Sequence, residues 1–302
     1  ENRWGVFYSV GGSWNIHREN FMSDLSFVNL LKLRASYGLN GNNNIAAYRA
    51  YGVYASAAYN GATGMFPSRP ENPVLSWEKN GTWNVGLDFT LWDKLDGNID
   101  VYNRLTTDML LDKNVPQTTG FSTNFLNIGS LQNNGVEIQL DYDILNTREL
   151  KWSVGGNIAF NKTKILDMGD NDWIAYSEDG RLRHVVGKSL YTFYLRDYYC
   201  VDPTNGDALF RDTDGNLTKD YNKAGYVYAG SPEPTYLGGF NTNVSWNGFQ
   251  LGAFFEYKGG NKVMLIEKRY LESDGASMNV NQVTTALNYW KKPGDTGVNP
   301  KP

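Results

Sequence analysis

Apolar and polar residues alternate with a period of two in eight separate segments, and this pattern constrains the fold more than any other feature. The clearest segment sets Val136, Ile138 and Leu140 against Glu137 and Gln139. A period of two places successive side chains on opposite faces of a β-strand, and helical spacing of apolar residues is nearly absent. The sequence therefore predicts an all-β, antiparallel fold. The eight predicted strands lie within Trp4–Ile16, Leu31–Asn40, Trp83–Leu91, Ile99–Met109, Gly135–Ile144, Trp152–Asn161, Phe240–Trp246 and Phe249–Lys258.

The connections between these segments alternate between short and long. The short set includes the dipeptide Asn247–Gly248, and Asn-Gly between alternating strands is the strongest short hairpin signal. Soluble β-sandwiches rarely sort their loops by length, whereas outer-membrane barrels have short periplasmic turns and long extracellular loops. The other short connections are Asp93–Gly97, Asn146–Leu150 and the compact His17–Val28. The long connections are Gly41–Gly81, Asp112–Asn134, Lys162–Tyr236 and the residues from Gly259 onwards.

The apolar faces of the predicted strands suit contact with lipid. Each segment is about as long as the 9 to 11 residues that a tilted strand needs to cross a bilayer. A Lys or Arg on a lipid-facing position costs about 2 to 4 kcal/mol at the bilayer midplane, and the apolar faces carry almost no charge. Trp14, Trp152 and Trp246 stand beside short turns, where an aromatic girdle is expected. Two residues do not fit: Asn103 interrupts an apolar face, and Trp92 is out of phase, which suggests a bulge.

Composition excludes several other classes of protein. One Cys cannot form an internal disulfide, and one Cys with two His cannot build a Cys/His zinc site. A formal charge of -4 argues against nucleic-acid binding, which needs basic clusters. No apolar run approaches the roughly 20 residues of a membrane-spanning helix. The chain opens with strand-like sequence, so we expect an export signal to have been removed or to lie upstream.

No catalytic constellation is recognisable, so we predict that the protein is not an enzyme. His17 and His184 are far apart in sequence, and neither belongs to a nucleophile or metal motif.

One stretch resembles part of a calcium loop. Oxygen-bearing side chains recur at every second residue in Asp212, Asp214, Asn216 and Asp220, with Thr218 between the last two, and such oxygens suit a hard cation. However, Leu217 stands where an EF-hand has its glycine, and Lys223 where it has its bidentate Glu. The alternative is an Asp/Gly-rich turn between short loop strands. Calcium is therefore one reading of this stretch, and we expect no other cofactor.

Aromatic residues in the long connections are candidates for ligand contact. Tyr54 and Tyr59 lie in the connection after the second strand, and Trp173 and Tyr176 in the connection after the sixth. Aromatic faces stack on sugar C–H surfaces, while hydroxyl and indole N–H groups form hydrogen bonds. The alternative is that these side chains pack the loops together or face a partner protein.

Five stretches together resemble the C-terminal β-barrel portion of SusC/RagA-type TonB-dependent outer-membrane transporters. They follow the family's order and spacing and cover most of the chain. The stretches are LKLRASYGLNGN (Leu31–Asn42), NPVLSWEKNGTWNVGLDF (Asn72–Phe89), YNRLTTDMLL (Tyr102–Leu111), TGFSTNFLNIGSLQNNGVEI (Thr119–Ile138) and GSPEPTYLGGFNTNVSWNGFQL (Gly230–Leu251).

The resemblance implies a segment of a barrel of about 22 strands closed around a plug in the bacterial outer membrane. It implies TonB-dependent import of a bulky nutrient, an oligosaccharide or alternatively a peptide. The implied partners are a SusD-like surface lipoprotein, the TonB complex and outer-membrane lipid. We expect residues 1–302 to be one partial barrel domain that lacks the plug, the TonB-contacting segment and the last strands.

Three other classes of protein stay open at this point. A soluble carbohydrate-binding β-sandwich would show the same alternation, because its apolar face would meet a second sheet. A passive porin and an adhesin barrel would share the membrane-facing pattern, but the resemblance disfavours both. Burial of Val136, Ile138 and Leu140 beneath a partner sheet of the same chain would contradict the membrane interpretation.

Overall fold

The structure is a computed structural model that describes residues 4–177, 179–273, 276 and 279–301, without the side chains of Tyr59 and Asn114. The chain divides into two compact units. The first comprises Glu1–Ile174, Val185–Leu190 and Pro234–Gly260, and the second Ala175–His184, Tyr191–Glu233 and Asn261–Pro302.

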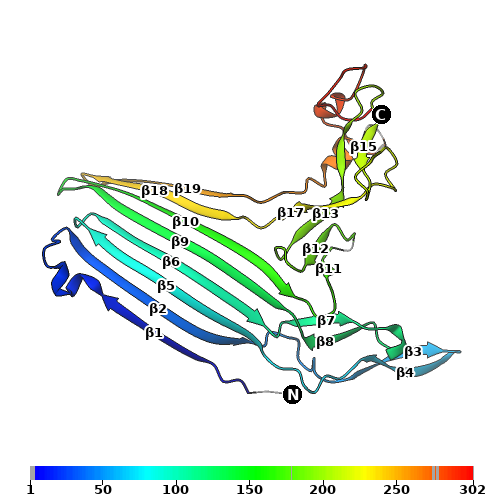
Figure 1. The fold of residues 1–302 in the computed structure, drawn as a ribbon, viewed down its shortest axis with the longest axis horizontal. Coiled ribbons are helices and arrows are strands. Elements are labelled where there is room, and N and C mark those ends of the chain that lie inside the picture. The colour runs from blue at the N-terminus through cyan, green and yellow to red at the C-terminus, as the bar shows by residue number, and fades with distance from the viewer. Residues whose placement is uncertain (1–3, 178, 274–275, 277–278, 302) are drawn as a thin grey trace. The chain divides into compact units, whose positions relative to one another are not determined.

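An eight-stranded antiparallel sheet dominates the first unit (Figure 1). Its spatial order is β1-β2-β5-β6-β9-β10-β18-β19, so neighbouring strands follow one another along the chain once the loop strands are set aside. All eight strands predicted from the alternation are present, and the all-β antiparallel prediction is confirmed. The strands are β1 (Tyr8–Asn15), β2 (Val28–Asn42), β5 (Glu78–Leu91), β6 (Leu95–Thr107), β9 (Ser130–Asn146), β10 (Leu150–Asp167), β18 (Tyr236–Trp246) and β19 (Phe249–Gly259).

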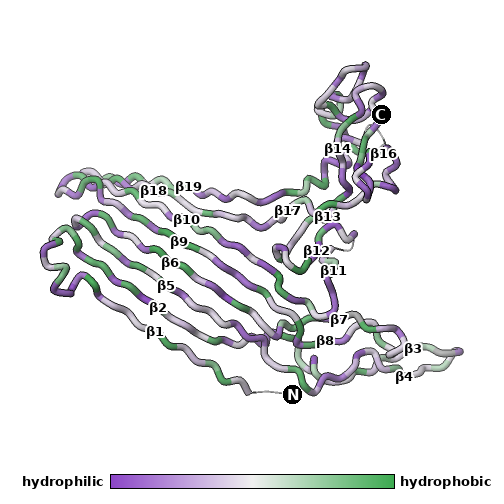
Figure 2. Tube along the Cα trace, viewed as in Figure 1, coloured by the Kyte–Doolittle hydropathy of each residue, from purple (hydrophilic) through white to green (hydrophobic). Residues whose placement is uncertain are grey.

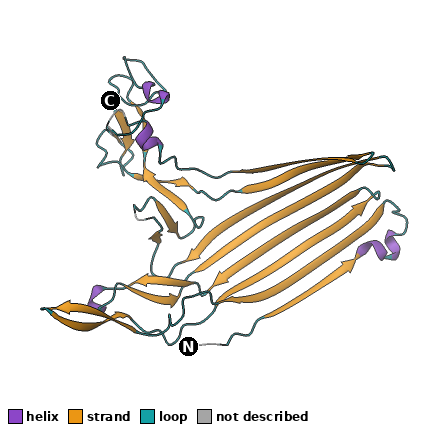
Figure 3. Ribbon diagram, turned by 180° about the vertical axis from the view of Figure 1, so that it is seen from behind, coloured by secondary structure: helices purple, strands orange, loops and turns teal. Residues whose placement is uncertain are grey.

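Two hairpins leave the sheet at the end opposite to the short turns (Figure 1). The first pairs β3 (Val53–Tyr59) with β4 (Ala62–Arg69), and the second pairs β7 (Leu110–Asn114) with β8 (Thr123–Asn127). Short and long connections therefore lie at opposite ends of the sheet, as the loop lengths predicted. Helical segments are few and short (Figure 3). In this unit they are the 3-10 turns Ile16–Arg18, Asn20–Met22 and Gln117–Thr119.

The second unit is built mainly from short strands. Strand β13 pairs with β12 and β17, and β15 pairs with β14 and β16, in each case antiparallel. The short strands after β10, of which β11 and β12 each have residues in both units, are β11 (Trp173–Ala175), β12 (Leu182–Val185), β13 (Thr192–Arg196), β14 (Tyr198–Val201), β15 (Ala208–Arg211), β16 (Leu217–Thr218) and β17 (Tyr226–Gly230). One helical turn, α1 (Lys268–Leu271), and the 3-10 turn Thr284–Leu287 lie nearer the C-terminus.

The register of the main sheet sorts apolar and polar residues onto opposite faces, and Figure 2 shows the alternation along each strand. Neighbouring rows across β2, β5, β6, β9 and β10 differ in chemistry. One row reads Leu33, Leu87, Ile99, Ile138 and Ile158, and the next row reads Arg34, Gly86, Asp100, Glu137 and Ala159.

The apolar face of the main sheet is uncovered. Val85 is 41% exposed, Leu140 43% and Phe160 45%. Val136 and Ile138 are half-buried, so the three residues chosen to test the membrane interpretation do not lie beneath a partner sheet among the described residues. Well-buried apolar side chains occur instead at the loop end and in the second unit. They include Leu75, Ile165, Met168, Phe193, Val201 and Ala224.

Several strands extend beyond the predicted ranges: β9 begins at Ser130 and β10 ends at Asp167, both within segments predicted as connections. Two predicted ranges instead extend beyond the observed strands. Strand β6 ends at Thr107, and Met109 is not part of it, because Asp108 has a φ of 56° that breaks the extended backbone. Met109 instead exchanges backbone hydrogen bonds with Ile128 and Gly129 beside the β7–β8 hairpin. Strand β1 begins at Tyr8, so the alternation from Trp4 starts before the paired region.

The two residues that broke the alternation now have explanations. Trp92 lies in the turn between β5 and β6 rather than in a bulge, with a φ of 56°, and its ring stacks on Phe27 at 5.6 Å. Asn103 donates from its amide to the side-chain oxygen of Asn134 at 2.6 Å across the β6–β9 pair. The predicted hairpin at Asn247–Gly248 is confirmed, since both residues have positive φ and Trp246 pairs with Phe249. No helix within the described residues is long and apolar enough to cross a membrane.

Candidate functional site

A charged cluster lies on the polar face of the main sheet. Arg34 on β2 donates from Nε to Asp88 on β5, at 3.0 Å to Oδ1, and from Nη1 and Nη2 to Asp100 on β6, at 2.7 and 2.6 Å. The strand between Arg34 and Asp100 contributes Gly86 at the same level, and a side chain there would collide with the guanidinium. Because the planar guanidinium of Arg34 donates hydrogen bonds to two carboxylates at once, the cluster joins β2, β5 and β6 in a fixed geometry.

Amides, hydroxyls and carboxylates also pair with one another across the polar face. The Tyr102 hydroxyl contacts the side-chain oxygen of Asn161 at 3.3 Å, and Gln139 donates to Asp141 at 2.9 Å. Such a surface satisfies its own polar groups while leaving them in contact with water or with another polar body. It provides a hydrogen-bonding wall and no reaction chemistry.

The sequence-predicted ligand-contact residues occupy different surroundings. Tyr54 on β3 is 65% exposed and Trp173 at the start of β11 is 45% exposed, both within the first unit. Tyr176 belongs to the second unit, where its ring packs edge-on against His184 and Tyr191, at 5.3 and 4.8 Å between centroids. The side chain of Tyr59 lies outside the described residues. The ligand-contact role of these four residues stays a prediction.

The predicted calcium stretch begins in the turn between β15 and β16, which contains Asp212, Asp214 and Asn216, and it ends at Asp220, after β16. The Asp212 carboxylate accepts backbone N–H bonds from Asp214 at 2.9 Å and Asn216 at 2.8 Å. The Asp220 carboxylate accepts one from Asn222 at 2.9 Å. This is the hydrogen bonding of an Asx turn. The described residues contain no group of three or more His, Cys, Asp or Glu side chains arranged to hold a metal ion. Calcium binding here stays a prediction.

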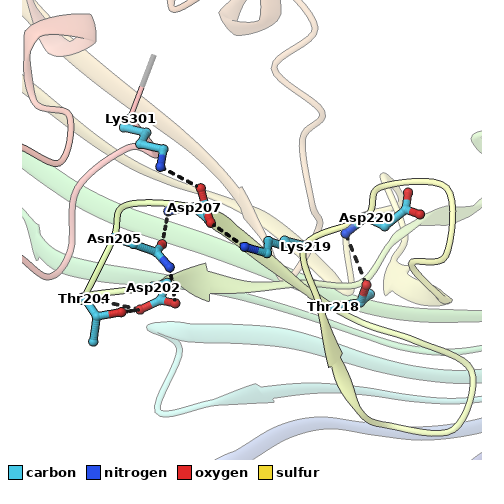
Figure 4. A network of polar contacts seen from close by, with 8 residues as sticks. All are labelled: Asp202, Thr204, Asn205, Asp207, Thr218, Lys219, Asp220 and Lys301. Carbon is cyan, nitrogen blue, oxygen red and sulfur yellow. Dashed lines mark hydrogen bonds and ion pairs between the residues drawn. The ribbon is translucent and has the colours of Figure 1, made fainter.

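A second polar network lies beside this turn, and sequence reasoning missed it (Figure 4). Asp207 accepts hydrogen bonds from Lys301 at 2.9 Å and from Lys219 at 3.1 Å, which hold the pKa of its carboxyl below the ordinary value. The neighbouring Asp202 accepts from the hydroxyl of Thr204 at 2.6 Å, and its pKa is lowered for that reason. No local pattern signals this network, because Lys301 is distant in sequence from both acids.

A stack of tyrosine and arginine side chains crosses the second unit. Tyr194 and Tyr226 lie face to face at 4.7 Å, with an angle of 4° between their planes. The Arg183 guanidinium lies over Tyr194 at 3.8 Å, and that of Arg196 lies over Tyr226 at 4.1 Å. Each cation–π contact is worth about 0.5 to 2 kcal/mol, depending on its exposure. One sequence feature could have indicated this stack: Tyr194 and Arg196 are two residues apart, which places both side chains on the same face of β13.

This architecture defines a class of protein. An antiparallel sheet with one uncovered apolar face, one self-paired polar face and short turns at one end is a segment of a large β-barrel. The family model for TonB-dependent receptor-like β-barrels matches residues 1–281, and the chain belongs to this family. The predicted resemblance is therefore confirmed. Members of the family are receptors and transporters rather than enzymes.

Several known proteins are similar to the chain. TonB-dependent receptor P26 of Formosa agariphila is 31% identical over 297 residues, which cover 89% of this chain and 29% of the receptor. TonB-dependent receptor SusC of Bacteroides thetaiotaomicron is 34% identical, covering 82% of this chain and 27% of SusC. The solved RagAB peptide importer in its open-open state is 28% identical with a TM-score of 0.87, covering 98% of this chain and 33% of the importer chain. The chain thus spans about three tenths of the length of these curated relatives.

Proposed function

We propose that this chain forms part of the wall of an outer-membrane barrel that imports a bulky nutrient by a TonB-dependent mechanism. The observation that carries the proposal is the continuous apolar face of the eight-stranded sheet, together with membership of the TonB-dependent receptor family. The proposed location is the bacterial outer membrane.

The energetics of the apolar face favour lipid as its cover. A large aliphatic or aromatic side chain gains about 1.5 to 3 kcal/mol when it leaves water. More than a dozen such side chains lie on this face and many are about half-exposed, so leaving them in water would cost an amount comparable with the whole stability of a typical domain, about 5 to 15 kcal/mol. A bilayer removes this cost without a second protein layer, which argues against the soluble sandwich.

The two edges of the sheet support a place within a larger barrel. Among the described residues, β1 pairs only with β2, and β19 only with β18. A free strand edge in lipid leaves backbone groups unsatisfied at several kcal/mol each, so both edges need further strands. The proposed barrel has about 22 strands, closed around a plug.

The proposed cargo is an oligosaccharide, and the proposed partners are a SusD-like surface lipoprotein and the TonB complex. Exposed aromatic side chains at Tyr54, Trp173 and Tyr176 support sugar stacking. A peptide cargo is the second candidate, and the similarity to the RagAB peptide importer favours it.

Uptake by cells tests the proposal. Cells with and without the receptor that carries this chain receive radiolabelled oligosaccharides and peptides, with and without a protonophore. We expect receptor-dependent uptake of oligosaccharide that stops when the protonophore removes the energy source. Uptake that continues with the protonophore would indicate a passive porin, and recovery of the receptor without detergent would indicate the soluble sandwich.

A further inference from the structure

The second unit contains a cavity of about 730 Å³ lined by the tyrosine–arginine stack. All of its lining residues belong to this one unit. The volume falls within the 300 to 1,000 Å³ typical of sites for small ligands. Four arginines and one aspartate contribute to the lining, and that aspartate, Asp179, already pairs with Arg181 at 3.2 Å.

Two of the lining arginines have no carboxylate partner among the described residues. Arg196 donates one N–H to the backbone oxygen of Ala224 and lies over the rings of Tyr226 and Tyr221, at 4.1 and 5.1 Å. Its Nε is buried without a hydrogen-bond acceptor among the described residues. Arg269 on α1 is exposed and makes no ion pair with a described residue. The cavity therefore holds positive charge that the described side chains leave uncompensated.

The rest of the lining includes aromatic and aliphatic side chains. Tyr194 and Tyr226 present stacked rings, and Met264, Leu265 and Ile266 add aliphatic surface from the segment before α1. The faces of these two rings are covered by each other and by Arg183 and Arg196, whereas Tyr198 and Tyr221, which also line the cavity, are 49% and 57% exposed. A pyranose ring offers C–H faces that pack on such exposed tyrosine rings, and a carboxylate or sulfate on that ring suits a guanidinium. A neutral sugar would leave the arginines desolvated and unpaired, which carries a cost.

We propose that this cavity binds an acidic oligosaccharide, one that carries uronate or sulfate groups, with Arg196 and Arg269 as the anion-binding residues. The identification of this ligand as cargo rests on the proposed import function, whereas binding itself does not. Arg196, which lies over two tyrosine rings, recognises the anion in a fixed orientation, and the more exposed Arg269 on α1 contacts it from a second side of the lining.

Calorimetry on the purified full-length receptor in detergent tests the proposal. The probes are a tetramer of galacturonate and its methyl ester, which has the same rings without the charges, and tetraglutamate supplies the same charge on a peptide. We expect the acid to bind at least about tenfold more tightly than its ester, and more weakly as salt rises. Equal affinity of acid and ester, or equal affinity of tetraglutamate and galacturonate, would overturn the proposal.

Substitutions locate the site. Arg269→Gln is on the surface and should fold, and we expect it to weaken binding of the acid about tenfold while leaving the weak binding of the ester unchanged. Arg196→Lys retains the charge but loses the flat guanidinium, and it should weaken binding as well. Arg211→Gln is the matched control, because Arg211 lies over Tyr199 outside the cavity. Full affinity in Arg269→Gln and Arg196→Lys would exclude this cavity. Tight binding without uptake in cells would refute import but not the site.

Discussion

The guanidinium of Arg34 lies directly over Gly86, so that a Cβ added at position 86 would stand 2.5 Å from the Arg34 Cζ. Gly86 is paired with both Arg34 and Asp100 in the sheet register, and the missing side chain leaves the space through which Arg34 reaches Asp100. A glycine in mid-strand ordinarily weakens a sheet. Here it permits an ion pair that spans three strands.

We predict that Gly86→Ala destabilises the barrel by about 1 to 2 kcal/mol, because the displaced Arg34 loses charge-assisted hydrogen bonds that are partly screened by water. The midpoint of urea unfolding in detergent, measured on the full-length receptor, checks this. Gly12→Ala is the control, since a Cβ at position 12 meets no atom within 4 Å. Equal midpoints for the two variants would contradict the role of Gly86.

The two faces of β9 should respond differently to charge. Ile138→Arg places a cation on the apolar face, which we propose to face lipid, and there we expect a loss of about 2 to 4 kcal/mol and much less folded receptor in the outer membrane. The neighbouring Gln139→Arg turns the same side chain to the polar face and should be tolerated. Immunoblots of outer-membrane fractions, with heated and unheated samples to separate folded from unfolded receptor, compare the pair. Equal abundance of both variants would refute the lipid-facing assignment.

The loop network at Asp207 should respond to acid. Because the pKa of Asp207 is lower in the folded protein than in an unfolded chain, its carboxylate favours the folded loop above the ordinary Asp pKa of about 3.9. This contribution disappears as the pH falls through the lowered folded pKa. Hydrogen exchange of residues 202–219 should therefore stay slow, after correction for intrinsic rates, until the pH falls below about 4.

Asp207→Asn should remove this pH dependence of hydrogen exchange. It should also speed exchange at neutral pH, because the side chain that pairs with Lys301 and Lys219 is then uncharged. Asp214→Asn, in the turn between β15 and β16, is the control, since among the described residues Asp214 contributes only its backbone N–H to that turn. The same pH profile in wild type and in Asp207→Asn would refute the assignment.

The exposed ring of Tyr54 gives a prediction for cargo contact. Tyr54→Ala should lower oligosaccharide uptake several-fold at unchanged receptor abundance, because the substitution removes the aromatic face on which the C–H surface of a sugar would pack. Tyr54→Phe keeps the ring and separates stacking from the hydroxyl. Uptake equal to wild type in Tyr54→Ala would show that the ring does not contact the cargo.

Sequence periodicity predicted the main sheet well because strand register and side-chain burial both follow the alternation of apolar and polar residues. All eight strands were found, and the turn at Asn247–Gly248 was placed correctly because Asn-Gly favours positive φ. The extension of the fourth strand to Met109 was wrong because Asp108 adopts a left-handed conformation that alternation does not reveal. Trp92 was out of phase for a related reason, since it lies in the turn.

The second unit was largely beyond sequence reasoning. Its strands are two to five residues long, too short for a period of two to be visible. Its contacts join distant segments, as in the pair of Asp207 with Lys301. The stretch from Asp212 to Asp220 was interpreted as either a calcium loop or a turn, and the turn geometry is observed while the binding of calcium remains to be measured.

The sequence alone determined that the chain is a set of long antiparallel strands with one apolar and one polar face, because side-chain direction in a strand depends only on whether a position is odd or even. Only the tertiary structure decided which polar residues meet. Arg34 reaches Asp100 across Gly86, and Arg196 lies over Tyr226, because strand register and loop packing bring together residues that no local pattern relates.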